Sequence, residues 1–185
     1  ASDVYKRQQG ISADPLAQSY SMRGVLQPPW THTELFSDNQ CQGIAKISTS
    51  CATIFTPTVP RSYITPSYRT NWMYDMLIDE LQRINEMLYG FDTWGIAEPL
   101  VYHRMSPNDP SWTARTEQFG VGPVRKLTFI LQLSDGESYE GGEMQVLYGN
   151  TVIDNLPRKR GTLIVFPSYM MYGIDVPVKG NHDFI

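Results

Sequence analysis

Apolar residues in the first half of the chain recur at helical spacing. The longest such stretch has them every three or four positions, at Trp72, Met76, Leu77, Leu81, Ile84 and Leu88. This periodicity predicts an amphipathic helix, and Gly90 is a suitable residue to end it. The opposite face carries acidic and other polar residues, so we expect one side of the helix to pack on a sheet.

A shorter helix is predicted directly after Ser37. The hydroxyl of Ser37 is followed three positions later by Gln40, which is the pattern of a capping box. The helix behind this cap would bury Cys41, Ile44 and Ala45. Between the two helices, residues 49–69 are polar and rich in proline, and we expect a loop with an edge strand there.

From about residue 97 the pattern changes to that of strands. Leu127, Phe129, Leu131 and Leu133 alternate with their neighbours, and Met144, Val146 and Tyr148 do the same. Residues 161–166 form a continuous apolar run between turn residues. Helices first and closely spaced strands second predict an α+β domain that is mainly β.

Length and composition indicate one globular domain. The chain has 185 residues, of which 41% are hydrophobic and 18% charged. A net charge of −4 argues against a general nucleic-acid binder, and no apolar run is long enough to cross a bilayer. Because the chain has only two cysteines, we expect no disulfide framework and a reducing, cytoplasmic setting.

Both ends of the chain differ in character from the rest. Residues 1–8 resemble a translated sequencing adapter, and we expect them to be a non-native leader that is not part of the fold. The last residues, His182 to Ile185, stop where a strand begins. We therefore expect a single domain over residues 9–185, truncated at its C-terminus.

Four short segments occur in an informative order. They are Arg125-Lys126-Leu127-Thr128, Tyr139-Glu140-Gly141-Gly142-Glu143-Met144, Gly161-Thr162-Leu163-Ile164-Val165-Phe166-Pro167-Ser168 and Val176-Pro177-Val178-Lys179-Gly180. Together they resemble the core of the 2-oxoglutarate/Fe(II) dioxygenases, in the branch of prolyl 4-hydroxylase and its phage-encoded relatives. The resemblance implies a double-stranded β-helix, or jelly roll, with flanking N-terminal helices. It also implies hydroxylation of a protein, peptide or small molecule.

The reactive residues that the resemblance implies are replaced in this chain. The family carries a His-x-Asp pair before the first segment and a distal His after Phe-Pro-Ser, where this chain has Thr113, Arg115 and Tyr172. The 2-oxoglutarate-binding Arg is replaced by His182. A facial triad needs two imidazoles and a carboxylate, and Arg cannot be a ligand because it stays protonated. We therefore expect no metal site and no catalytic residue.

Three functions remain open from the sequence, of which the third, an interaction or virion-associated module, rests only on the phage-like character of the motifs. The first is a degenerate family member, a binding or structural domain that uses no cofactor and takes a protein partner or a small anionic ligand. The second is an active hydroxylase that uses Fe(II) and 2-oxoglutarate through other ligands. Tyr102 and Lys126 are candidate pocket residues in either case.

Arg115 and the histidines carry more local expectations. A buried Arg115 needs a partner, either an internal carboxylate such as Asp175 or a bound anion. His182 is interpreted as a polar residue on a late strand, His103 as a strand residue and His32 as a loop residue.

Overall fold

The computed structural model describes residues 30–51, 53–54, 61–110, 112–116, 124–148 and 151–185. The leader expected at residues 1–8 lies outside these ranges. The described residues are mainly β, as predicted. Their helices are α3 (Asp38–Ser50), α4 (Asn71–Ile84), the π-helical turn η1 (Asn85–Tyr89) and the 3-10 turn η2 (Gly136–Ser138).

Helix α3 begins with the expected capping box. The Ser37 hydroxyl accepts from the Gln40 backbone N–H at 3.4 Å, and the Ser37 N–H donates to Gln40 Oε1 at 2.9 Å. Cys41 and Ile44 are fully buried, as predicted, whereas Ala45 is only partly buried. The helix is therefore fixed at its start by side chains and along its length by an apolar stripe.

The buried stripe of α4 differs from the predicted one. Leu77 and Ile84 are buried as expected, but Trp72, Met76, Leu81 and Leu88 are only partly buried. Met73 and Tyr74, which the periodicity did not single out, fill the centre of the contact. Tyr74 is buried because its hydroxyl donates to the Ile64 carbonyl at 2.6 Å and accepts from the Leu100 N–H at 3.1 Å. Gly90 ends the helical segment at a positive φ of 64°, as predicted.

The larger layer of strands consists of two hydrogen-bonded groups. Its first group has the order β1-β10-β6, and its second has the order β13-β4-β3-β2, all antiparallel. A bridge between Gln132 and Phe184, with hydrogen bonds between Leu131 and Ile185, joins the groups. The strands are β1 (Thr31–Glu34), β2 (Thr53–Ile54), β3 (Arg61–Ile64), β4 (Leu100–Met105), β6 (Leu127–Leu131), β10 (Thr162–Pro167) and β13 (His182–Phe184).

The smaller layer has the order β5-β11-β8-β9, with the pair β12-β7 beside it. These strands are β5 (Trp112–Arg115), β7 (Glu140–Gly141), β8 (Met144–Tyr148), β9 (Thr151–Ile153), β11 (Met171–Ile174) and β12 (Pro177–Lys179). The predicted strands at 127–133, 144–148 and 161–166 correspond to β6, β8 and β10. His32, interpreted as a loop residue, instead lies in β1 opposite Ile164, because β10 supplies an edge for that segment to pair with.

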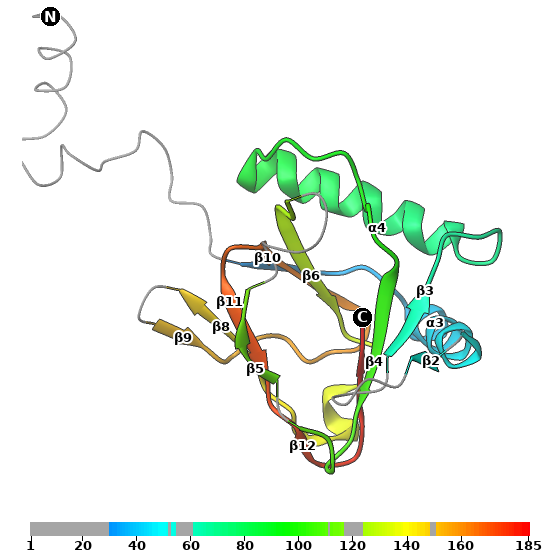
Figure 1. Ribbon diagram of the computed structural model, residues 1–185, viewed down its shortest axis with the longest axis vertical. Helices are drawn as coiled ribbons and strands as arrows, with labels where there is room; N and C mark the ends of the chain where they lie inside the picture. The colour runs from blue at the N-terminus through cyan, green and yellow to red at the C-terminus, as the bar shows by residue number, and fades with distance from the viewer. Residues whose placement is uncertain (1–29, 52, 55–60, 111, 117–123, 149–150) are drawn as a thin grey trace, which may run out of the picture.

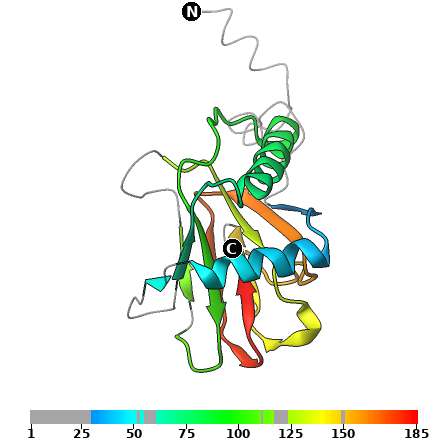
Figure 2. The same cartoon turned by 90° about the vertical axis from the view of Figure 1, so that its right-hand side faces the viewer.

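Two apolar clusters lie on the two faces of the larger layer. Alternate residues of β6 and β10, such as Leu131 and Leu163, pack toward α3 and α4. Their neighbours Ile130 and Ile164 pack toward the smaller layer. Figure 1 shows α4 along one side of the strands, and Figure 2 shows α3 crossing in front of them. Among the described residues, no helix combines the length and the apolar character that a membrane span requires.

Candidate functional site

A cavity of about 720 Å³ lies between the two layers of strands at the end nearest α4. Its walls come from β3, β4, β5 and β6, together with residues 92–99 and one face of α4. Lys126, a candidate pocket residue from the sequence, lines this cavity. Tyr102 does not, because successive residues of a strand point to opposite faces and Tyr102 packs in the cluster under the helices.

A β-bulge in β5 determines which side chains face the cavity. Tyr172 pairs with Arg115 and Ile174 with Trp112, so between these pairs β5 has two residues where β11 has one. An extra residue of this kind re-aims the side chains next to it. As a result, Trp112 and Arg115 both line the cavity, although simple alternation would separate them. The side chain of Thr113 lies outside the described set.

Arg115 packs between two aromatic rings. Its guanidinium carbon lies 4.1 Å from the centre of the Trp112 ring and 5.7 Å from that of Tyr172. Its Nη2 donates to the Tyr172 hydroxyl at 3.3 Å. Asp175, one partner considered from the sequence, is instead exposed and accepts from Gln145 at 3.4 Å. Cation–π contacts and the phenol therefore hold the guanidinium at the cavity wall.

Two further residues of the cavity were not recognised in the sequence as site residues. Arg61 on β3 is directly opposite His103 on β4, and both line the cavity. Burial, followed by the charges of Arg61 and Arg115, lowers the pKa of His103 to about 3. The imidazole is therefore neutral at pH 7. Arg61 falls in the proline-rich segment for which a loop with an edge strand was expected, and the period-two pattern of β3 is the signal that could have revealed it.

His182 lies away from this cavity, inside the molecule. It is fully buried on β13, and its Nε2 is 2.7 Å from Gln132 Oε1. The ring stacks on Tyr139 at 4.5 Å, and Tyr139 in turn packs against the Arg158 guanidinium. Burial, followed by the charge of Arg158, lowers the pKa of His182 to about 4. A neutral, enclosed imidazole at this position has no charge with which to hold a carboxylate.

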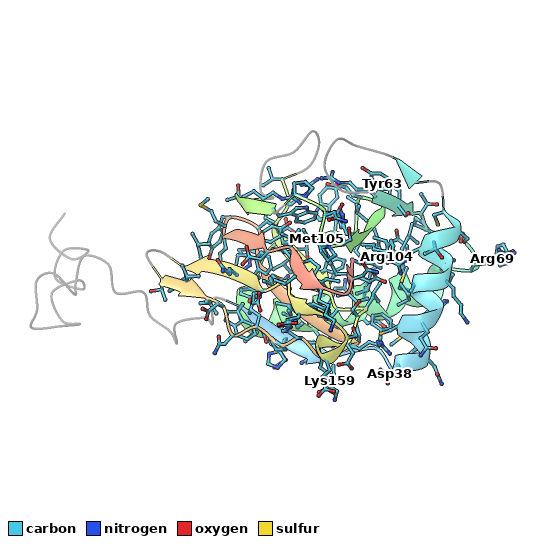
Figure 3. The ribbon with its side chains drawn as sticks, turned by 90° about the horizontal axis from the view of Figure 1, so that it is seen from below. Asp38, Tyr63, Arg69, Arg104, Met105 and Lys159 are labelled. Atoms are coloured by element: carbon cyan, nitrogen blue, oxygen red, sulfur yellow. The ribbon has the colours of Figure 1, made fainter. Side chains whose placement is uncertain are left out.

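The space between His182 and Arg115 is filled by rings. Phe184 lies 4.8 Å from His182 and 5.5 Å from Trp112, measured between ring centres. His103 lies 5.1 Å from Phe184 and 4.6 Å from Trp112. On the face of β4 opposite to His103, Arg104 points toward the α3 side. Met105, on the same face as His103, points into the strands (Figure 3).

Arg115 and Tyr172 do not supply the ligands that a facial-triad iron site needs. Arg115 cannot coordinate a cation, and it contacts Tyr172, the residue that the sequence resemblance aligns with the distal ligand. Within the described part of the chain, no group of three His, Cys, Asp or Glu side chains is arranged to hold a metal. His103 is flanked by two guanidinium groups, whose charges oppose a divalent cation.

The fold is similar to that of several solved oxygenases. A prolyl-4-hydroxylase from Pseudomonas putida superposes with a TM-score of 0.66 at 13% identity, over 84% of this chain and 89% of that one. A 2OG-Fe(II) oxygenase family oxidoreductase from Burkholderia pseudomallei gives 0.67 at 13% identity, over 84% and 81% of the two chains. The viral collagen prolyl hydroxylase of Paramecium Bursaria Chlorella virus-1 gives 0.64 at 15% identity, over 87% and 95%. No family model and no curated protein matches the sequence.

Proposed function

We propose that this chain, which has the fold of the 2-oxoglutarate/Fe(II) oxygenases and of the prolyl hydroxylases among them, is a binding domain without iron chemistry. Fold alone does not determine function, which depends on the residues of the site. Here the scaffold is kept and the side chains at the reacting positions are changed. The cavity between the strand layers is then a place to bind a ligand rather than to oxidise one.

The contact between Arg115 and Tyr172 is the observation that carries this proposal. These residues occupy two positions where the resemblance implies iron ligands, and they pair across neighbouring strands. Their side chains meet at 3.3 Å, so the place of a metal ion is taken by a guanidinium and a phenol. A permanent cation within that space would repel Fe(II).

The buried rings beside this contact support the same proposal. Phe184 lies between His182 and Trp112 and contacts both. His182 bonds to Gln132 inside the protein and is fully buried. A 2-oxoglutarate molecule that joined the family's Arg position to its metal position would have to displace this packing. The free energy of burying these rings opposes such a change.

The arrangement of strands also supports a double-stranded β-helix. Strands that follow one another in the chain alternate between the larger and the smaller layer: β10 lies in the larger one, β11 in the smaller with β12 beside it, and β13 in the larger again. The apolar cluster enclosed by the layers takes residues from both, including Phe166, Met144 and Val146. Such a closed pair of sheets is a rigid frame on which a ligand site can be built.

Metal titration tests the proposed function. Anaerobic calorimetry with Fe(II), and with Mn(II) as a redox-stable substitute, is expected to detect no stoichiometric binding to the wild type. The matched variant Thr113→His/Arg115→Asp/Tyr172→His restores the ligand set that the resemblance implies. We expect this variant to gain metal binding if the scaffold still holds the positions together. Micromolar binding of one metal per wild-type chain would contradict the proposal and favour an active hydroxylase.

A further inference from the structure

We propose that the cavity binds a small molecule through an oxyanion, a carboxylate or a phosphate, held between the guanidinium groups of Arg61 and Arg115 beside the His103 ring. This inference rests on the proposed function, because the anion occupies a site that carries no metal. It assigns binding to residues on β3, β4 and β5, away from His182.

The charge of the cavity wall is the first argument. Four cationic side chains and two carboxylates line the cavity, in a chain whose net charge is −4. One of those carboxylates, Glu98, is bonded to Arg125 at 2.7 Å. An excess of positive charge in a concave site with low-dielectric walls attracts anions from solution.

Buried polar atoms without partners are the second argument. Among the described residues, Nε of Arg61 and Nδ1 of His103 are buried and have no hydrogen-bond partner. The His103 side chain is only 6% exposed, and it lines the cavity. Leaving a buried polar group unsatisfied is unfavourable, and such groups in a native protein call for a ligand, ion or water.

The geometry of the two guanidinium groups is the third argument. Arg61 and Arg115 come from opposite layers of strands, and both charges act on the His103 ring. Arg115 is held by stacking on Trp112, so its fork is fixed before a ligand arrives. A planar guanidinium can donate two parallel hydrogen bonds to one carboxylate or phosphate. The neutral imidazole can add a donor without competing for the negative charge.

The rest of the cavity wall is largely apolar, with Ile78, Leu81 and Leu127 among its residues. A ligand with an oxyanion and a short carbon skeleton would match both parts of the wall.

Calorimetric titration with three probes, in EDTA, tests this site. Succinate and 2-oxoglutarate represent carboxylates, and inorganic phosphate represents the other oxyanion. We expect one-site saturable binding of at least one probe. Arg61→Gln and Arg115→Gln should each weaken it by about tenfold or more, because each removes a charge-assisted hydrogen bond. Binding of the dicarboxylates without phosphate would identify a carboxylate ligand, and the reverse a phosphate; either supports the site.

Arg104→Gln is the matched control, because Arg104 lies next to His103 on the same strand but points to the opposite face. The affinity of this variant for the anion probe should stay within about twofold of that of the wild type. Equal weakening in Arg104→Gln, or no saturable binding of any probe by the wild type, would overturn the proposed site. Thermal melts establish that each variant folds, and Arg61→Gln, at a partly exposed position, provides the test if Arg115→Gln unfolds.

A parallel titration with Mn(II) in place of EDTA separates the two proposals. Anion binding that needs the metal would contradict both the anion site and the absence of metal chemistry. If the protein binds neither the anion nor the metal, the proposed anion site is overturned and the proposed function stands.

Discussion

Arg115 and Tyr172 face each other across neighbouring strands and share a hydrogen bond of 3.3 Å, although 57 positions separate them in the chain. Trp112 completes the contact by packing under the guanidinium. The guanidinium is thus held at the cavity wall by the rings of Trp112 and Tyr172 and by the Tyr172 hydroxyl. Because such contacts stabilise a cation that is partly removed from water, they give Arg115 a structural role in addition to the proposed binding role.

Replacing Arg115 with Met should destabilise the protein by about 1–3 kcal/mol. The change removes a cation–π contact and a hydrogen bond from a charged donor while keeping an apolar stem. Urea denaturation measures the difference in the free energy of unfolding. Arg104→Met, which removes a half-exposed ion pair with Asp183, is the control and should change stability by less than about 1 kcal/mol. Equal stability of Arg115→Met and wild type would show that the guanidinium packing contributes nothing.

Truncating Leu77 to Ala should destabilise the protein more than truncating Leu81. Leu77 is a fully buried residue of α4, so we expect a loss of about 2–5 kcal/mol for Leu77→Ala. Leu81 is only partly buried and borders the cavity, so its truncation removes less packing and the loss should be smaller. Denaturant midpoints of the two variants provide the comparison. A larger shift for Leu81→Ala would contradict the packing of α4 described above.

Stability should fall as the pH drops from about 6.5 toward 4, in part because of His182. Its pKa is lowered to about 4 in the folded protein, whereas an unfolded His binds a proton near pH 6.5. The unfolded state therefore gains a proton first, and the stability present above pH 6.5 is lost as the pH falls. For one His with this shift, the loss amounts to about 3 kcal/mol. His103, with a pKa of about 3, should act in the same direction.

The variant His182→Gln measures this contribution, because Gln can still donate to Gln132 but does not titrate. Its free energy of unfolding should depend less steeply on pH between 6.5 and 4 than that of the wild type. Parallel curves for the two proteins would rule out a neutral, buried His182 as a source of the pH dependence.

Two glycines should respond in opposite ways to substitution by Ala. Gly161 has a φ of +82°, and an added Cβ would lie 1.9 Å from the Phe36 carbonyl oxygen. Gly161→Ala should thus be destabilising by more than about 2 kcal/mol, since the left-handed backbone alone disfavours Ala by 1–2 kcal/mol. Gly43, inside α3 with open space around it, should gain about 0.5–1 kcal/mol from the same change. Melting temperatures that move in the same direction would contradict this contrast.

The local elements of this protein could be predicted from the sequence. The Ser37–Gln40 capping box, the end of the helical segment at Gly90 and the strands β6, β8 and β10 all follow from interactions within a few residues. The order of the short motifs also pointed to the oxygenase fold, with which the solved structures agree. Arg115 stood out for a chemical reason, because an arginine cannot replace a metal ligand.

The composition of the cavity was decided only by the tertiary structure. The bulge that turns both Trp112 and Arg115 to the cavity arises where β5 pairs with the distant β11, and nothing within β5 specifies that register. Arg61 joins His103 only because β3 pairs with β4. Periodicity and capping depend on near neighbours in the chain and can therefore be predicted from the sequence. Strand register and the burial of charged groups depend on contacts between distant segments, which form only in the folded molecule.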